Sequence, residues 1–339
     1  MLLRKLLALL LVFVVLLLAG CTAAPVAPAA PAAEDGTAAV PAAEGEPVKG
    51  GTAIVGTPQE PGTLNPLLIL ATIEDVISSF VIEGLVQIDD QGQYIPVLAT
   101  DLPTVSDDGL TVTYQLKPGV KFSNGDPLTC ADVVYTWKAI LSDLSQASTS
   151  GYSSIDSVDC PDDNTVVVKF AEVYAPYLRL FSYILPQAAG DPAALDSWEF
   201  NRKPIGTGPW MLSDWQAGNF IEFVPNPNYR EAGKPYLEKL IVKILPSREV
   251  GMQLLGTGEI LVLWDVTEAD FPALDALKEQ GVAYATARTG ENELMVFNFA
   301  DPTVDAPADA SANPHPILND LRVRQAIQYA INKQELADT

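Results

Sequence analysis

Few residues of this chain have the types and spacing that catalysis requires. Acidic pairs occur at Asp107-Asp108 and Asp162-Asp163, and two neighbouring carboxylates could act as general acid and base. Each pair, however, stands just before Gly or Asn between predicted strands, which is typical of solvated turns. We therefore interpret both pairs as turn residues, and we predict no catalytic residue in the chain and no enzyme activity.

The single histidine gives no support to nucleophilic or metal chemistry. His315 stands between Pro314 and Pro316 in an expected loop, and no acidic residue is arranged around it to complete a serine-type triad. The chain has no CxxC motif, so we predict no metal site and no cofactor. The stretch GTGPW at 206–210 lacks both the GK[ST] ending and the GxGxxG pattern of phosphate-binding loops.

Two of the three cysteines, Cys130 and Cys160, favour a disulfide. An exported protein meets an oxidising compartment, and a bridge between residues thirty positions apart would stabilise the fold by roughly 3 to 4 kcal/mol through loop closure. Two separately buried thiols are the alternative, because the sequence does not supply the Cα separation.

The third cysteine, Cys21, follows an export signal. Residues 4–5 are basic, residues 6–18 form an apolar run of thirteen, and Ala19 and Gly20 are small. The run is shorter than the roughly 20 residues that a membrane-spanning helix needs. A cleaved signal peptide over residues 1–20 is therefore the better interpretation.

The sequence Leu-Ala-Gly-Cys at 18–21 resembles the lipobox of bacterial lipoproteins, in which the cysteine is acylated and the chain is cut just before it. An ordinary secretory peptide with a nearby cysteine is the alternative. Residues 22–50 contain eleven Ala and five Pro and lack aromatic residues, so they predict an unfolded tether. Lipidation of Cys21 would attach a folded body to a membrane surface.

The overall negative charge argues against nucleic acid as a partner. The chain has 339 residues and a net charge of -23, so its surface should repel nucleic acid phosphates. Residues 51–339 are enough for about two domains.

Hydrophobic periodicity predicts a mixture of strands and helices, and therefore an α/β architecture. The predicted strands are 51–56, 85–88, 111–116, 120–122, 165–170, 219–226, 238–245 and 294–299. The predicted helices are 76–84 with Gly84 as C-cap, one opened by the capping box Thr129 and Asp132, 176–184, 250–255 and 320–336.

Several segments, in order, resemble the extracytoplasmic solute-binding proteins of peptide/nickel-type ABC importers, family 5. Their order and spacing match as well as their letters. The segments are GTLNP (62–66), the run from YIPVLATDLP to VVYTW (94–137), GTGPW (206–210), VPNPNYREAGKPYLEKLIVKI (224–244), GTGEI (256–260) and NDLRVRQAIQYAINKQEL (319–336). Two positions depart from the family pattern: Leu261 replaces an acidic residue after GEI, and Cys130 replaces a small one.

The resemblance implies a periplasmic-binding-protein-like bilobal fold of type II with an inserted extra domain. The first lobe would comprise residues 51–92 and 204–290, and residues 93–203 would be the inserted domain. Residues 291–339 would begin a second lobe. Family members continue beyond this point, so we expect a C-terminally truncated chain with an incomplete second lobe.

The resemblance also implies a binding function at the membrane surface. We expect a lipid-anchored, extracytoplasmic monomer that captures peptides or a related small solute and partners the permease and ATPase subunits of an ABC importer. An exported hydrolase that uses Asp and Glu residues is the alternative from another class, and a chaperone-like or adhesive surface lipoprotein is a third. The identity of the ligand stays open.

Family positions indicate the ligand-contacting residues. A carboxylate at Asp265 could receive a ligand amine or amide, or it could be a surface turn residue. Core packing is the alternative role for Trp264. The positions that the resemblance indicates are Leu70, Ala71, Thr72, Trp264 and Asp265, with Leu294 and Asn298 as weaker candidates.

Overall fold

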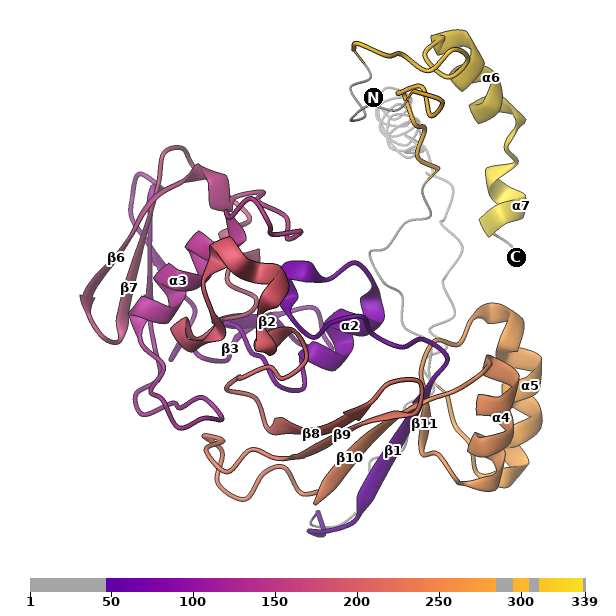
Figure 1. Ribbon diagram of the computed structural model, residues 1–339, viewed down its shortest axis with the longest axis horizontal. Helices are drawn as coiled ribbons and strands as arrows, with labels where there is room; N and C mark the ends of the chain where they lie inside the picture. The colour runs from indigo at the N-terminus through magenta and orange to yellow at the C-terminus, as the bar shows by residue number, and fades with distance from the viewer. Residues whose placement is uncertain (1–46, 285–294, 305–310, 338–339) are drawn as a thin grey trace, which may run out of the picture. The chain divides into compact units, whose positions relative to one another are not determined.

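The computed structural model describes residues 47–284, 295–304 and 311–337 (Figure 1). The described residues divide into two compact units, one of residues 47–283 and 330–337 and the other of residues 284, 295–304 and 311–329. Within the described ranges, no helix is both long and apolar enough to cross a membrane.

The described elements are a mixture of short strands and helices, which confirms the α/β class. The strands are β1 (Thr52–Thr57), β2 (Val86–Ile88), β3 (Tyr94–Pro96), β4 (Thr104–Val105), β5 (Thr111–Gln115), β6 (Ile155–Asp162), β7 (Thr165–Phe170), β8 (Trp210–Gln216), β9 (Phe220–Pro225), β10 (Lys239–Ile244) and β11 (Val262–Leu263). The α-helices are α2 (Thr72–Ser78), α3 (Cys130–Ile140), α4 (Arg248–Thr257), α5 (Phe271–Leu277), α6 (Leu321–Ala330) and α7 (Lys333–Ala337). Short 3₁₀ turns are η1 (Pro66–Leu68), η2 (Tyr152–Ser154), η3 (Tyr177–Arg179), η4 (Gln187–Ala189), η5 (Pro192–Ser197), η6 (Glu199–Asn201), η7 (Glu268–Asp270) and η8 (Lys278–Gln280).

A five-stranded mixed sheet has the order β11-β1-β10-β9-β8, seen in the lower part of Figure 1. Strand β1 runs parallel to both β10 and β11, whereas β9 is antiparallel to β10 and β8. One face is apolar, because Ile221 and Phe223 of β9 and Leu240 and Val242 of β10 are buried. The predicted strands at 51–56, 219–226 and 238–245 are confirmed.

A four-stranded antiparallel sheet has the order β4-β5-β7-β6. The strand predicted at 111–116 is confirmed as β5, in which Val112 and Tyr114 are buried while their neighbours are more exposed. Helix α3 packs against β6 and β7, and Cys130 at its start forms a disulfide with Cys160 of β6, with a Cα separation of 5.7 Å. The bridge therefore ties the helix to the edge of the sheet.

The predicted capping box at the start of α3 is present. Asp132 accepts hydrogen bonds from the backbone N–H of Thr129 at 2.9 Å and from its hydroxyl at 3.0 Å. The other carboxylate oxygen accepts from the N–H of Gln187 at 3.0 Å. One buried acidic side chain thus begins the helix and fixes a neighbouring loop.

The predicted helix at 176–184 is wrong. The chain makes a single 3₁₀ turn, η3, and then Phe181 adopts a positive φ of 56°. Backbone N–H groups here donate to other segments: Phe181 to the hydroxyl of Tyr152, and Ile184 to the carbonyl of Glu83. These hydrogen bonds to distant segments take the place of the hydrogen bonds that a helix would make.

The helix predicted at 76–84 lies earlier, as α2, and Gly84 is not its cap. A Cβ on Gly84 would come within 2.3 Å of the backbone of Ser182. Glycine therefore allows two backbone segments to approach closely at this position.

Three further predictions need correction. Residues 120–122 make an isolated bridge between Lys121 and Pro127 and no strand. In the described part of 294–299, residues 295–299 are not a strand. The single helix predicted at 320–336 is two helices, α6 and α7, separated at residues 331–332. A hydrophobic pattern does not locate such interruptions, because it records burial and not backbone pairing.

The lobe boundaries stay a prediction. Strands β2 and β3 pair with each other across the boundary at residue 92, and a continuous core joins residues of both sheets. Phe80 and Phe223 make an edge-to-face contact at 5.8 Å within this core.

Candidate functional site

The carboxyl ends of the parallel strands β1, β10 and β11 meet at one edge of the five-stranded sheet. Ligands of open α/β sheets characteristically bind outside the carboxyl ends of parallel strands, where loops carry the contact residues. The segments that follow these three strands bring Gln59, Arg248 and Asp265 together. We name these three residues and Asp270 the edge cluster.

Local structure positions each member of the edge cluster. After β1, the N–H of Gln59 donates to the hydroxyl of Thr57 at 3.2 Å, which turns the chain. After β10, the hydroxyl of Ser247 accepts from the N–H of Val250, so Arg248 is the first residue of α4. Figure 1 shows α4 beside β11, and α5 packs against α4.

The edge cluster has one cation between two carboxylates. The guanidinium of Arg248 lies 3.6 Å from Oδ2 of Asp265 and 3.4 Å from Oδ2 of Asp270. The amide of Gln59 donates to Oδ2 of Asp265 at 3.4 Å. Asp270 also accepts from the N–H of Thr267 at 2.9 Å and thereby caps η7. Both of these contacts to Asp265 are long, so they hold its carboxylate weakly.

Asp265 has an uncommon backbone conformation, with φ at 68°. Asp and Asn adopt this left-handed region more readily than most non-glycine residues. Its neighbour Trp264 continues the pairing of β11, because its N–H donates to the carbonyl of Gly56 at 2.8 Å. Trp264 is 36% exposed, so it is not a core residue here. The ligand-contact role of both residues stays a prediction, and Asp265 lies at a bend of the chain.

The segment of Leu70, Ala71 and Thr72 lies at the start of α2 and is exposed. Glu74 already accepts the N–H groups of Leu70 at 2.7 Å and of Ala71 at 3.1 Å. These two backbone donors are therefore occupied by the protein itself. Within the described ranges, no hydrogen bond or ion pair joins this segment to Trp264 or Asp265.

The two weaker candidates, Leu294 and Asn298, stay predictions. Leu294 lies outside the described residues. Asn298 belongs to the other unit, where its side chain accepts from the N–H of Ala300 at 2.9 Å. Cys21, the predicted lipidation site, also lies outside the described residues.

Sequence reasoning missed Arg248 and Gln59. Ser247, a good N-cap residue directly after a predicted strand, could have indicated that the helix starts at Arg248. Nothing in the sequence shows that β1, β10 and β11 are parallel neighbours, and that arrangement brings the three side chains together.

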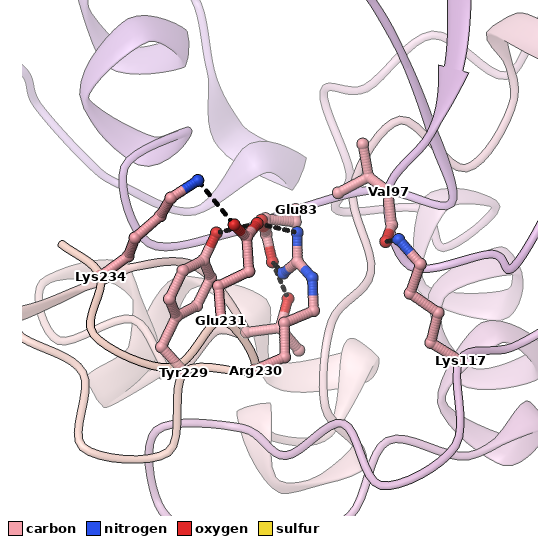
Figure 2. Close-up of polar contacts among 8 residues, drawn as sticks. Glu83, Val97, Lys117, Tyr229, Arg230, Glu231 and Lys234 are labelled. Atoms are coloured by element: carbon pink, nitrogen blue, oxygen red, sulfur yellow. Dashed lines mark hydrogen bonds and ion pairs between the residues drawn. The ribbon is translucent and has the colours of Figure 1, made fainter. Parts of the chain in front are cut away.

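A second polar group, centred on Glu83, is buried and structural (Figure 2). Its carboxylate pairs with Arg230 and accepts from the hydroxyl of Thr207 at 3.0 Å. The side chains of Glu83 and Arg230 are 8% and 15% exposed. We name Glu83, Arg230 and Thr207 the buried pair group; it joins three segments that are distant in sequence.

The ion pair also affects the neighbouring titratable groups. Burial opposes the charge of Arg230, but the hydrogen bond and charge of Glu83 raise its pKa. Burial and the charge of Glu83 raise the pKa of Tyr229 to about 12. A hydrogen bond from Lys234 lowers the pKa of Glu231, and Figure 2 shows this second pair beside Arg230.

The glycines of GTGPW serve packing. A Cβ on Gly206 would lie 1.9 Å from the carbonyl oxygen of Val81, and one on Gly208 would lie 2.7 Å from that of Phe80. The N–H of Gly208 donates to Val81 and its carbonyl accepts from Asn226. These backbone groups are satisfied inside the fold, so the segment is not a phosphate loop in this structure.

The other candidate features are also structural. Asp108 and Asp162 accept backbone N–H groups of Leu110 at 3.0 Å and Asn164 at 2.8 Å, so the predicted turn role is confirmed for these two residues. His315 accepts two backbone N–H groups at Nδ1. In the part of the chain that the structure describes, no group of three or more potential ligands could hold a metal ion.

A cavity of about 240 Å³ lies beside the start of α3, lined in part by Phe122, Pro127 and Asp132. Both carboxylate oxygens of Asp132 are used by Thr129 and Gln187. The carboxylate of Asp132 is therefore already held by the protein on both oxygens.

Comparison with known proteins decides the family. The sequence pattern of the bacterial extracellular solute-binding proteins, family 5 (middle region), matches residues 93–339. The chain belongs to family 5 of the extracellular solute-binding proteins. Residues 51–92 precede this match and supply β1, whose carboxyl end carries part of the edge cluster.

Relatives agree with this family assignment. Protein XP55 of Streptomyces lividans is 30% identical over 314 residues, which is 89% of this chain and 53% of that protein. The oligopeptide-binding protein AppA of Bacillus subtilis is 29% identical over 300 residues, or 86% of this chain and 52% of AppA. The family 5 chain thus spans about half the length of these relatives.

Solved structures agree with the fold. The structure of AppA in complex with a nonapeptide has a TM-score of 0.61 and 30% identity, and covers 67% of this chain and 46% of AppA. That of NikZ from Campylobacter jejuni in complex with Ni(L-His) has a TM-score of 0.57 and 25% identity, and covers 62% of this chain and 42% of NikZ. The mixed α/β family 5 chain therefore corresponds to part of a bilobal binding protein.

Proposed function

We propose that this chain is the solute-capturing part of an extracytoplasmic substrate-binding protein that serves an ABC importer. Family membership over residues 93–339 is the observation that carries the proposal. The proposed ligand is a peptide or a related small solute, because AppA is an oligopeptide-binding protein and its structure holds a nonapeptide. The relevant part of the surface is the carboxyl edge of β1, β10 and β11.

The physical requirements of such a function fit this edge. A solute-binding protein needs groups that a ligand can reach and that are not already saturated by the protein. Trp264 is exposed and the contacts of Asp265 are long. The buried pair group and GTGPW are saturated, so they are better suited to hold the scaffold.

The hydrolase alternative is not carried forward. Asp108 and Asp162 are engaged in exposed turns. A general acid in such enzymes usually needs a raised pKa, whereas hydrogen bonds lower the pKa of both carboxyls.

Binding without turnover tests the proposed function. The 339-residue chain would be mixed with a defined set of tripeptides and analysed by native mass spectrometry and calorimetry. We expect saturable binding of one ligand per chain and no cleavage products. Product formation, or no saturable binding of any peptide, would contradict the proposal.

Membrane attachment through Cys21 is a separate part of the proposal, supported by the lipobox-like sequence at 18–21. The chain would be expressed in a bacterium and its N-terminal fragment weighed by mass spectrometry. We expect a diacylglyceryl modification and recovery with membranes, and release of the protein by Cys21→Ser. Equal membrane recovery of the variant would argue against the anchor.

A further inference from the structure

The single histidine of the chain holds a turn through one ring nitrogen. Nδ1 of His315 accepts from the backbone N–H of Ile317 at 3.1 Å and from that of Leu318 at 2.9 Å. A ring nitrogen accepts a hydrogen bond only while it carries no proton, so these contacts require a neutral imidazole with its proton on Nε2. His315 is half-buried, and protons from the solvent can therefore reach the ring.

Other turns of the same form use side chains that do not change over this range of pH. In each of them Oδ1 of an Asn or Asp that precedes a proline accepts from the N–H two residues further on. The turns are Asn65-Pro66-Leu67 at 3.0 Å, Asp191-Pro192-Ala193 at 3.0 Å and Asp301-Pro302-Thr303 at 2.9 Å. His315-Pro316-Ile317 places Nδ1 at the equivalent point. Amide and carboxylate oxygens stay acceptors between pH 5 and 8, whereas an imidazole changes its charge there.

The turn held by His315 leads directly into α6. The guanidinium of Arg324, in α6, donates to the carbonyl oxygens of Leu318 at 2.7 Å and Asn319 at 2.9 Å. His315 accepts the N–H of the same Leu318. The turn is therefore fixed on its N–H side by the imidazole and on its carbonyl side by the helix. Loss of the imidazole contacts would free the N–H side and loosen the start of α6.

Charged groups on both neighbouring segments act on the imidazole. Asp301 interacts electrostatically with His315, and the two segments pair through the bridge between Ala300 and Pro314. The other charged residues that the structure describes in this unit are Asp320, Arg322 and Arg324, at the start of α6. Asp301 favours an imidazolium, whereas Arg324 opposes it. Neither can replace the two acceptor contacts at Nδ1.

We propose that His315 makes the start of α6 sensitive to pH: the neutral imidazole holds the turn at residues 315–320, and protonation at Nδ1 releases it. A proton taken from the solvent would point an N–H of the ring at two backbone N–H groups, so both hydrogen bonds would be lost. Family 5 proteins are extracellular, and their surroundings set the pH that reaches such a group. The inference does not depend on which solute the protein binds.

Hydrogen–deuterium exchange of the 339-residue chain tests the turn directly. Exchange in residues 316–324 is measured by mass spectrometry at pH 7.5 and 5.0, and protection is expressed relative to the intrinsic exchange rate at each pH. Nitrogen-15 labelling of histidine reports the protonation of this one ring by NMR. We expect Nδ1 to be unprotonated at pH 7.5. Protection should fall at least about tenfold once the ring is protonated, because two hydrogen bonds are lost.

The turn at Asn65 is the internal control, because its amide acceptor does not titrate. Protection in residues 65–70 should change within about twofold between the two pH values. Exposed Asp and Glu side chains remain mostly ionised at pH 5.0, so a change confined to residues 316–324 points to the imidazole.

Variants locate the effect. His315→Asn supplies an acceptor that does not titrate, as Asn65 does, and we expect protection that changes within about twofold between the two pH values. His315→Ala removes the acceptor, so protection should be low at both pH values. Asp301→Asn removes the neighbouring charge and keeps an acceptor for its own turn, and the tenfold decrease should persist. Circular dichroism and thermal unfolding verify that each variant is folded.

Several results would overturn the inference. A ring that stays neutral at pH 5.0, or one that is protonated while the turn stays protected, would do so. A decrease that persists in His315→Asn, or one that disappears in Asp301→Asn, would assign the pH dependence to another group. Wild-type protection in His315→Ala would show that the imidazole does not hold the turn. The proposed function is tested separately, by the binding of peptides.

Discussion

The buried pair group and the edge cluster use the same chemistry, an arginine beside carboxylates, in opposite surroundings. Glu83 and Arg230 are 8% and 15% exposed, and Thr207 adds a hydrogen bond to Glu83. In the edge cluster, Arg248 and Asp265 are 33% and 30% exposed and lie 3.6 Å apart. Burial makes the first group costly to disturb, whereas exposure leaves the second group free to exchange partners.

The two groups have different roles in the molecule. The buried pair group connects the segment after α2 with the loops before β8 and after β9, and so holds the scaffold together. The edge cluster lies on the segments that follow three strands, and we expect it to contribute little to that scaffold. A substitution in the buried pair group should therefore lower stability, whereas a comparable substitution in the edge cluster should change ligand binding.

Glu83→Gln tests the buried pair group, for which we expect the larger loss of stability. We expect a loss of roughly 3 kcal/mol in the free energy of unfolding, near the lower end for a broken buried pair, because Glu231 still lies 3.9 Å from Arg230. Urea denaturation followed by tryptophan fluorescence gives the value. Glu199→Gln, in the exposed pair with Lys203, is the control and should change stability by about 0.5 kcal/mol or less. Similar losses in the two variants would refute the contrast.

Removal of the disulfide extends the comparison to a covalent tie. The double variant Cys130→Ala and Cys160→Ala opens a loop with a sequence separation of 30. We expect it to lose roughly 3 kcal/mol by the loop-closure relation. Denaturation of the oxidised wild type and the variant gives the difference. A loss below about 1 kcal/mol would show that the bridge adds little to the packing of α3.

The titration of Tyr229 sharpens the description of the buried pair group. The pKa of Tyr229 is raised to about 12, so the folded state keeps the phenol proton at pH values at which the unfolded state has lost it. The stability that the protonated Tyr229 phenol contributes is present below about pH 10 and is lost as the pH rises towards 12. Ultraviolet difference spectra of wild type and Tyr229→Phe give the pKa. In Glu83→Gln it should fall, because a negative charge is removed; an unchanged value would contradict the electrostatic cause.

Asp265→Asn gives the smallest expected change in stability. The carboxylate is part of an exposed, long-range pair, so we expect the free energy of unfolding to change by about 0.5 kcal/mol or less. The same denaturation measurement as for Glu83→Gln applies. A loss above about 2 kcal/mol would mean that Asp265 is part of the scaffold, and it would remove the contrast on which the binding proposal depends.

Local elements were predictable where one physical signal dominated. Alternation placed β5 and β7 correctly, and the pattern of Thr129 and Asp132 placed the start of α3, because both depend on neighbours in sequence. The helix predicted at 176–184 was wrong, because the backbone N–H groups of Phe181 and Ile184 donate hydrogen bonds to Tyr152 and to the backbone of Glu83. Such partners lie far away in sequence and cannot be recognised from local periodicity.

The site was predictable in part. Family position indicated Trp264 and Asp265, whose contact with a ligand stays a prediction. Arg248 and Gln59 were missed because only the parallel pairing of β1 with β10 and β11 brings them near Asp265. The grouping of Leu70, Ala71 and Thr72 with those residues remains a prediction.

The sequence alone determined the acidic charge, the lipobox-like segment ending at Cys21, the α/β character and the family resemblance, because these depend on composition and on local order. Tertiary structure decided which Arg and carboxylate groups are buried and which are exposed. Burial changes the free energy of a charge by changing its access to water, and that access depends on residues that the fold gathers from distant positions.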